Sequence, residues 1–222
     1  MKSYRKNGIM FYIYNLHDID KLAFDLLTGD CFVYGANDEL LHKFNTIYSV
    51  FNMQYHIPVF INESYHLLYI GNWENGLYCY NILNGRIQWH RKLTKTRHLF
   101  LFNDFVSVEV CNKGVFFLNC VNGETVKSIR YPAIDFMFQL SDKLLFFGQQ
   151  NSEFKLYSCQ KHEIIGVIDQ KNINVSNYLN FVILEAYLQG NTLYYSGFQE
   201  QSGLRKPTDF TYNINIEEFI YR

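Results

Sequence analysis

Carboxylates are the side chains of this sequence best suited to catalysis. Seven of them lie on or just after short apolar stretches that we expect to be strands: Asp18, Asp20, Glu63, Asp104, Asp135, Asp142 and Glu185. Paired carboxylates can share the acid role and the nucleophile or base role of a glycoside hydrolase. The catalytic candidates are Asp135 and Glu185, because each lies within an expected strand. Four others lie at expected hairpin turns, where accepting backbone hydrogen bonds explains them better: Asp20, Glu63, Asp104 and Asp142.

Metal and nucleotide chemistry have no comparable signal. The seven histidines show no H-x-H or H-E-x-x-H spacing, so a metal site would have to be assembled from distant parts of the chain. Ser3 and Ser152 each precede a lysine by three residues, but neither is accompanied by the motifs that surround a catalytic S-x-x-K. There is also no glycine-rich phosphate loop. The sequence therefore predicts no metal and no cofactor.

Binding to another protein requires only suitable side chains on exposed loops. The irregular segments most available for this are 46–55, 93–97, 149–152, 171–177 and 199–207. Aromatic residues and arginine contribute most to protein contacts. The partner-binding candidates in these segments are Tyr48, Phe51, Tyr55 and Arg97. For the aromatic candidates, the alternative is burial between neighbouring sheets.

The composition favours strands. Phe, Tyr and Trp make up 18% of the 222 residues, whereas alanine, the best helix former, occurs only four times. Lys and Arg number 20 and Asp and Glu number 21, for a net charge of −1. Because no overall positive field attracts polyanions, we expect neither a nucleic-acid partner nor an anionic membrane partner.

The location of the protein can also be predicted. The apolar run near the N-terminus ends in Asp18 and Asp20 without a small-residue cleavage site, and no segment approaches the roughly eighteen apolar residues of a membrane span. The five cysteines are odd in number, widely spaced and never arranged as C-x-x-C, so we expect buried, reduced thiols. We predict a cytoplasmic protein, either a monomer or a small oligomer.

A repeated pattern of strands and turns is clearest over residues 67–93. Apolar strands are expected there at 67–71, 77–81 and 86–92, with Asn84-Gly85 in the second turn. An Asn-Gly pair is typical of a type I′ hairpin, in which both central residues have positive φ. The pattern recurs over 105–129, where Gly123 lies 38 residues after Gly85. Less regular copies occupy 22–44, 144–168 and 192–221.

Each copy follows one more apolar stretch, which completes four strands per unit. The segment 179–188 could be helical from its pattern, but we predict a strand because it occupies this place in the repeat. The sequence thus predicts an all-β fold, a single small propeller domain over 1–222 with about five four-stranded antiparallel blades. The approximate blades are 9–44, 56–92, 98–129, 134–168 and 180–221. With the last strand at 216–221, closure needs no strand borrowed from the other terminus.

The best-defined unit resembles the quinoprotein-type (PQQ-like) β-propeller repeat. The matching residues are Ile70-Gly71, Gly76-Leu77-Tyr78-Cys79-Tyr80-Asn81 and Asn84-Gly85-Arg86-Ile87-Gln88-Trp89. The resemblance implies four-stranded blades. It does not bring the quinone with it, because the dehydrogenases of that family hold their cofactor between a Trp and a disulfide of adjacent cysteines, and this chain has no adjacent cysteines. We therefore expect Trp89 to anchor the packing between blades.

Two hypotheses about function follow. The first is a non-enzymatic, intracellular protein-binding propeller, and a specific form of it is an immunity or inhibitor protein for a toxin or an enzyme. The alternative is an enzyme acting on a carbohydrate or another small molecule through carboxylates in the propeller funnel. It requires at least two of four carboxylates to lie within about 10 Å of each other: Asp18, Glu63, Asp135 and Glu185.

Overall fold

The computed structural model describes residues 2–6, 9–16, 19–25, 27–48, 59–131, 133–149, 153–169, 178–201 and 208–217. These residues form strands and turns, with a short 3-10 turn at Ala36–Asp38. The predicted all-β class is therefore confirmed, and so is the strand expected at 179–188, which is β18. Within this described part of the chain, no helix is long and apolar enough to cross a bilayer.

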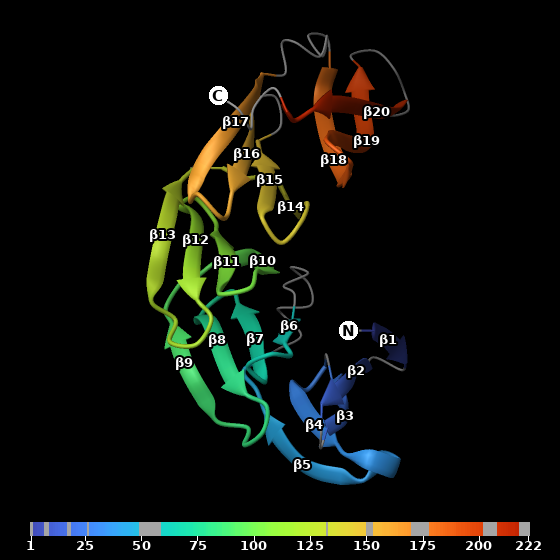
Figure 1. The fold of residues 1–222 in the computed structure, drawn as a ribbon, viewed down its shortest axis with the longest axis vertical. Coiled ribbons are helices and arrows are strands. Elements are labelled where there is room, and N and C mark those ends of the chain that lie inside the picture. Colours follow the sequence, from blue (N-terminus) through green and yellow to red (C-terminus); the bar gives the residue numbers. More distant parts are fainter. Residues whose placement is uncertain are drawn as a thin grey trace. The chain divides into compact units, whose positions relative to one another are not determined.

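The chain divides into two compact units, residues 1–130 and 131–222, and each is built of antiparallel sheets whose strands follow one another in chain order (Figure 1). The first unit holds three sheets. Sheet 1 consists of β1 (Lys2–Lys6), β2 (Ile9–Leu16), β3 (Ile19–Asp25), β4 (Asp30–Tyr34) and β5 (Leu40–Asn45). Sheet 2 consists of β6 (Val59–Asn62), β7 (Leu67–Asn72), β8 (Gly76–Asn81) and β9 (Ile87–Arg91). Sheet 3 consists of β10 (Thr96–Leu101), β11 (Phe105–Val110), β12 (Gly114–Asn119) and β13 (Thr125–Arg130).

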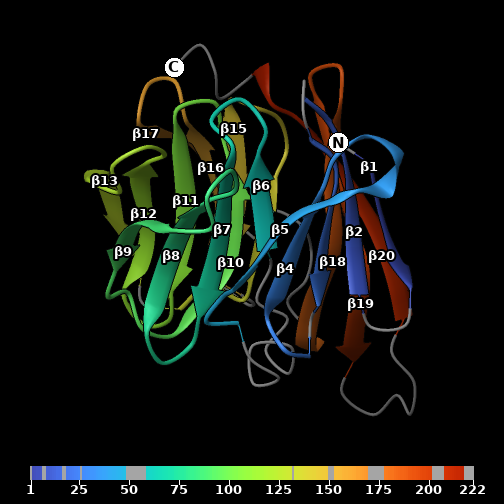
Figure 2. The same cartoon turned by 90° about the horizontal axis from the view of Figure 1, so that it is seen from below.

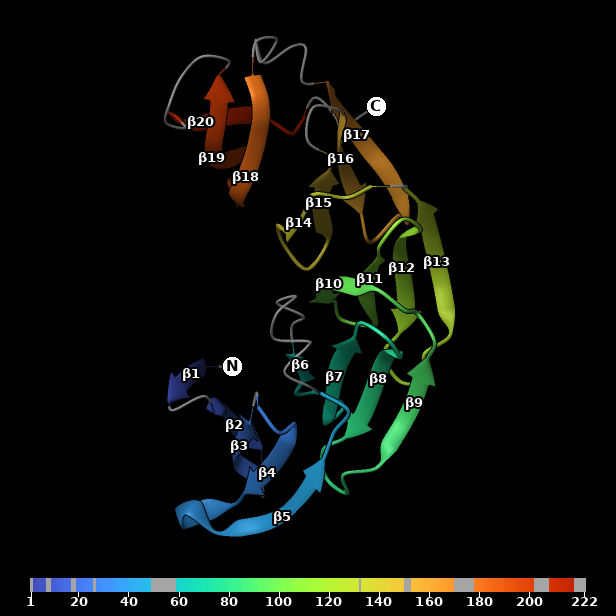
Figure 3. The same cartoon turned by 180° about the vertical axis from the view of Figure 1, so that it is seen from behind.

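The second unit holds two sheets. Sheet 4 consists of β14 (Phe136–Gln139), β15 (Leu144–Gly148), β16 (Glu153–Ser158) and β17 (Glu163–Asp169). Sheet 5 consists of β18 (Tyr178–Gln189), β19 (Thr192–Gln201) and β20 (Thr208–Asn215). Figures 2 and 3 show the strands of each sheet from two further sides. The number of sheets agrees with the five predicted blades, but among the described residues sheet 1 has five strands and sheet 5 has three, where four were predicted. The single-domain organisation over 1–222 stays a prediction.

An Asx turn ends the third strand of sheets 2 and 3. The side-chain oxygen of Asn81 accepts hydrogen bonds from the N–H groups of Leu83 and Asn84 at 3.0 and 3.3 Å. In sheet 3, Asn119 accepts the N–H groups of Val121 and Asn122 at 2.9 and 3.1 Å. Gly85 then takes a φ of +68°, whereas Asn84 has no positive φ. The predicted type I′ turn is therefore wrong: five residues form the connection, and a β-bulge follows in the ladder between β8 and β9.

A second hydrogen bond recurs just beyond the Asx position. The buried residue there donates its N–H to the carbonyl of the residue that precedes the second strand. The bonds are Ile82 to His66 (2.8 Å), Cys120 to Asp104 (3.0 Å), Cys159 to Lys143 (2.7 Å) and Ile216 to Asn191 (2.7 Å). We call this bond the turn lock. It ties the loop after the third strand to the loop before the second strand within one sheet.

The turn lock also identifies which strands of the two terminal sheets, 1 and 5, are equivalent to the strands of sheets 2 to 4. In sheet 1 the bond runs from Thr46 to Gly29 at 2.9 Å, so β3, β4 and β5 correspond to the first three strands of sheets 2 to 4. The strands β1 and β2 are then additional, and β1 was not predicted. In sheet 5 the lock lies at Ile216, which forms a turn after β20. Residues 218–221 of the strand predicted over 216–221 lie outside the described residues.

The cores lie between neighbouring sheets of the same unit. One apolar cluster joins sheets 1 and 2, a second joins sheets 2 and 3, and a third joins sheets 4 and 5. Trp89 belongs to the second cluster and is only 8% exposed. Its Nε1 and the hydroxyl of Tyr69 donate to the carbonyl of Cys120, at 2.9 and 3.2 Å. The predicted packing role of Trp89 is thus confirmed.

Candidate functional site

The catalytic candidates of the sequence both lie in the second unit. Asp135 is exposed just before β14. Glu185 is exposed in β18, at an irregularity in the ladder, and accepts a hydrogen bond from Ser196 Oγ at 2.6 Å. Glu63, Asp104 and Asp142 lie in the connections between the first and second strands of sheets 2, 3 and 4, where turn residues were predicted. Asp18 lies outside the described residues, and Asp20 lies at the start of β3.

The partner-binding candidates have different surroundings. Tyr48 is only 6% exposed, and its ring packs edge-on against Phe24 with 5.2 Å between centroids. Its role in the structure is therefore the packing role that the sequence offered as the alternative. Phe51 and Tyr55 lie outside the described residues. Arg97 lies in β10 with part of its side chain in solvent.

Positive charge gathers at one end of sheets 2 and 3. In an antiparallel meander, the end of the fourth strand, the start of the first strand and the turn between the second and third strands lie at the same end. In sheets 2 and 3 these places carry six cations, which we call the basic end: Arg91, Lys92, Lys95, Arg97, Lys113 and Arg130. The acidic residues at this end are the exposed Glu74 and the buried Glu109.

Lys95 is held at the basic end by an unusual backbone. Its φ is +64°, a left-handed conformation that costs a residue with a side chain about 1–2 kcal/mol. The conformation is held by two hydrogen bonds: Lys95 donates its N–H to the carbonyl of Trp73 at 2.6 Å and accepts the N–H of Cys111 at 3.0 Å. These partners belong to the turns of sheets 2 and 3. The exposed ammonium-bearing side chain therefore starts from a fixed point between two sheets.

Glu109 neutralises part of the charge on β10. Its carboxylate is 1% exposed and accepts hydrogen bonds from the Arg97 guanidinium, including Nε at 3.1 Å, while His98 Nδ1 lies 2.6 Å away. A buried carboxylate needs such partners, because its desolvation costs several kcal/mol. Arg97 therefore has a structural role in addition to its place at the basic end.

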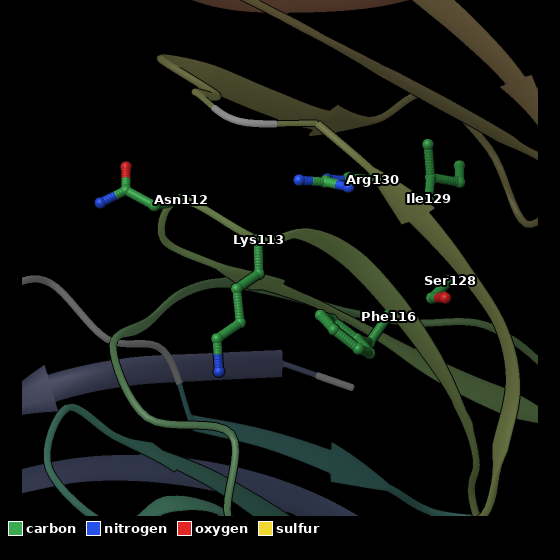
Figure 4. A pocket seen from close by; sticks show the side chains of 6 residues that line it. All are labelled: Asn112, Lys113, Phe116, Ser128, Ile129 and Arg130. Carbon is green, nitrogen blue, oxygen red and sulfur yellow. The ribbon is translucent and has the colours of Figure 1, made fainter.

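The face of sheet 3 opposite the Glu109 side chain carries a pocket of about 320 Å³. It is lined by Asn112, Lys113, Phe116, Ser128, Ile129 and Arg130 (Figure 4). Glu109 on β11 pairs with Val115 on β12, so these two side chains lie on one face of sheet 3. Phe116 is the next residue along β12, so its side chain points to the other face. Lys113 comes from the turn between β11 and β12, and Arg130 from the end of β13. Among the described residues, neither cation has an acidic group within ion-pair distance.

Sequence reasoning missed the basic end because the net charge of −1 concealed it. A local signal was present: residues 75–103 contain five Lys and Arg and no Asp or Glu. Lys113 and Arg130 have no such signal, because they join this group only through the pairing of β11, β12 and β13. In the described part of the chain, no group of three or more His, Cys, Asp or Glu is placed to hold a metal ion.

Comparison with known proteins bears on the fold. No protein-family model matches this chain, and no curated protein matches it either. The computationally designed Ika8 protein superposes with a TM-score of 0.59 at 11% identity, covering 96% of this chain and 57% of Ika8. BamB from Moraxella catarrhalis, a β-propeller, superposes with a TM-score of 0.51 at 15% identity, covering 86% of this chain and 64% of BamB.

These likenesses show a propeller-type repeat fold, in agreement with the five meandering sheets. The chain spans 57% and 64% of the lengths of the two structures. At identities of 11% and 15%, the comparison concerns the fold alone.

Proposed function

We propose that this chain is a non-enzymatic, cytoplasmic protein-binding module of the β-propeller type, and that its basic end holds a partner with an acidic surface. The observation that carries the proposal is Lys95, an exposed cation kept in a left-handed conformation by the turns of two sheets. Backbone strain of this kind persists where the surroundings enforce it, and it is concentrated at functional sites. The five free thiols suit a reducing compartment.

Electrostatics explains why a protein partner suits this surface. Arg91, Lys92 and Lys95 follow one another closely along the chain, and no acidic residue lies between 75 and 103. A patch of one charge speeds the encounter with a complementary surface and disfavours partners of like charge. Lysine and arginine at a rim act mainly on the association rate, so the complex should weaken as salt rises.

A variant that removes the side chain without straining the backbone tests the proposal. Lys95→Gly suits this purpose, because glycine adopts positive φ freely. Partners captured by cross-linking from native lysate would be identified by mass spectrometry for the wild type and for Lys95→Gly. We expect Lys95→Gly to fold at least as stably as the wild type and to lose the captured partner.

The matched control is Arg86→Ala. Arg86 is an exposed cation just before β9 of sheet 2, at the end of this sheet opposite Arg91 and Lys92. We expect Arg86→Ala to keep the partner. A partner retained by Lys95→Gly, or lost equally from both variants, would show that the basic end is not the binding surface.

A narrower form of the proposal is that the partner is a toxin or an enzyme whose activity the chain blocks. The cationic surface supports it only as a means of holding an acidic protein. Mixing the two purified proteins and measuring the partner's activity tests this form. Full activity in the complex would leave a binding protein that is not an inhibitor.

A further inference from the structure

We propose that the pocket on sheet 3 binds a phosphate monoester, with the phosphoryl group held by Lys113 and Arg130 and its organic substituent against Phe116. This inference goes beyond the proposed function, because a small ester could occupy the pocket without a protein partner, and it assigns a second ligand to Lys113 and Arg130, which also belong to the basic end. The same group could also come from a phosphorylated side chain of a peptide. Both sources share the chemistry of a tetrahedral dianion on an apolar group.

The hydrogen-bond donors around the pocket can serve a ligand group with more than two oxygen atoms. Arg130, at the end of β13, offers a planar fork of N–H groups. Lys113, in the turn between β11 and β12, offers an ammonium group. Asn112 and Ser128 add an amide and a hydroxyl. A carboxylate has two oxygens, which the arginine fork alone can satisfy. A phosphoryl group has three terminal oxygens and close to two negative charges at neutral pH, so it makes use of both cations.

The charge of the pocket is not neutralised from within the described residues. Its six lining residues include two cations and no acid. The nearby carboxylate of Glu109 lies on the other face of sheet 3, where it bonds to Arg97 and His98. A dianion would therefore meet Lys113 and Arg130 without displacing an existing ion pair.

The remaining wall of the pocket is apolar. Phe116, which is half-buried in β12, supplies this apolar wall. Figure 4 shows the Phe116 ring, Lys113 and Arg130 among the side chains that line the pocket. A ring of this kind packs against another aromatic or apolar group. The volume of about 320 Å³ lies at the lower end of the range for small-molecule sites, which suits one phosphorylated group and its immediate substituent.

Titration calorimetry with the full chain tests the inference, with phenyl phosphate as the probe. The comparison ligands are inorganic phosphate, which lacks the ring, and benzoate, which has the ring but only a carboxylate. We expect phenyl phosphate to bind at least several-fold more tightly than either. Arg130→Ala should weaken its binding by about tenfold or more, as expected for hydrogen bonds between charged groups. Phe116→Leu should reduce the preference over inorganic phosphate, because the aromatic surface is lost while an apolar side chain remains.

The matched control is Lys127→Ala. Lys127 is an exposed cation on β13 that pairs with Phe117 and does not line the pocket, so its loss should leave binding unchanged. A phosphotyrosine peptide separates the two sources: tighter binding than phenyl phosphate assigns the site to a peptide, and equal binding assigns it to a small ester. Equal binding of benzoate, or equal losses in Arg130→Ala and Lys127→Ala, would overturn the inference.

These outcomes are distinct from the test of the proposed function. Phenyl phosphate binding is measured on the purified chain in the absence of the partner. The partner test depends on Lys95, which does not line the pocket. Circular dichroism of each variant would confirm that the exposed substitutions leave the fold intact.

Discussion

Gly123 should not tolerate an added methyl group. A Cβ at this position would lie 2.6 Å from Cδ2 and 2.7 Å from Cε3 of Trp89. The indole cannot easily move, because it is buried and its Nε1 bonds to the carbonyl of Cys120. The residue also has a φ of +71°. Gly123→Ala therefore combines backbone strain with overpacking.

The two contributions give the expected magnitude. A left-handed alanine costs about 1–2 kcal/mol, and overpacking in a core costs about 1–3 kcal/mol. We expect the free energy of unfolding to fall by about 2–5 kcal/mol in Gly123→Ala. Urea unfolding followed by tryptophan fluorescence measures this free energy. The two tryptophans, Trp73 in the β7–β8 turn and Trp89 in β9, both belong to sheet 2, which the added methyl group would contact.

Two controls separate the contributions. Gly190 has a φ of +60°, but an added Cβ would meet nothing within 4 Å, so Gly190→Ala should cost only the strain. Gly123→Ala in a Trp89→Leu background should likewise cost about 1–2 kcal/mol. The reasoning would be refuted if Gly123→Ala cost the same in both backgrounds, or no more than Gly190→Ala.

Three further predictions concern the ionisable groups. Glu109→Gln should lower the free energy of unfolding by about 2 kcal/mol, because Arg97 loses its charged acceptor; a change below about 0.5 kcal/mol in urea unfolding would contradict this. At pH 8, Ellman's reagent should modify one thiol quickly, the partly exposed Cys111, since the other four are buried; two fast thiols would be inconsistent with the structure. Burial raises the pKa of Cys159 and of Tyr80 to about 12. Above about pH 9 the unfolded chain therefore releases protons that the folded chain retains, and thermal unfolding should show stability falling from about pH 9 to 12; a flat profile there would argue against this burial.

The meander could be predicted because its signals are local. The turns around Gly85 and Gly123 lie 38 residues apart, and short apolar strands bounded by Asn and Gly lie between the turns. Trp89 could be assigned to packing for the same reason. Even where the turn residues had changed, the backbone kept its form: His162 takes the place of glycine in sheet 4 with a φ of +55°.

The turn type and the basic end could not be predicted in the same way. The Asn-Gly pair allows several connections, and the side-chain acceptor Asn81 selects the five-residue one. Tyr48 lies in a segment that reads as a loop, yet its ring enters the core of sheets 1 and 2. The neighbourhood of Lys95 and Cys111 follows from the pairing of β10 and β11 and from a bond between loops, neither of which has a sequence pattern of its own.

The turn lock has a consequence for how such a chain can change over generations. Each lock joins two loops of one sheet, so it forms wherever that sheet's own residues are present. Repeat proteins built of such self-contained units have stabilities that add up from the units and their nearest neighbours. Duplication or loss of a stretch of gene that encodes a whole sheet would leave every remaining lock intact. A break in the middle of a sheet would destroy one, so we expect tolerated insertions to fall between the sheets.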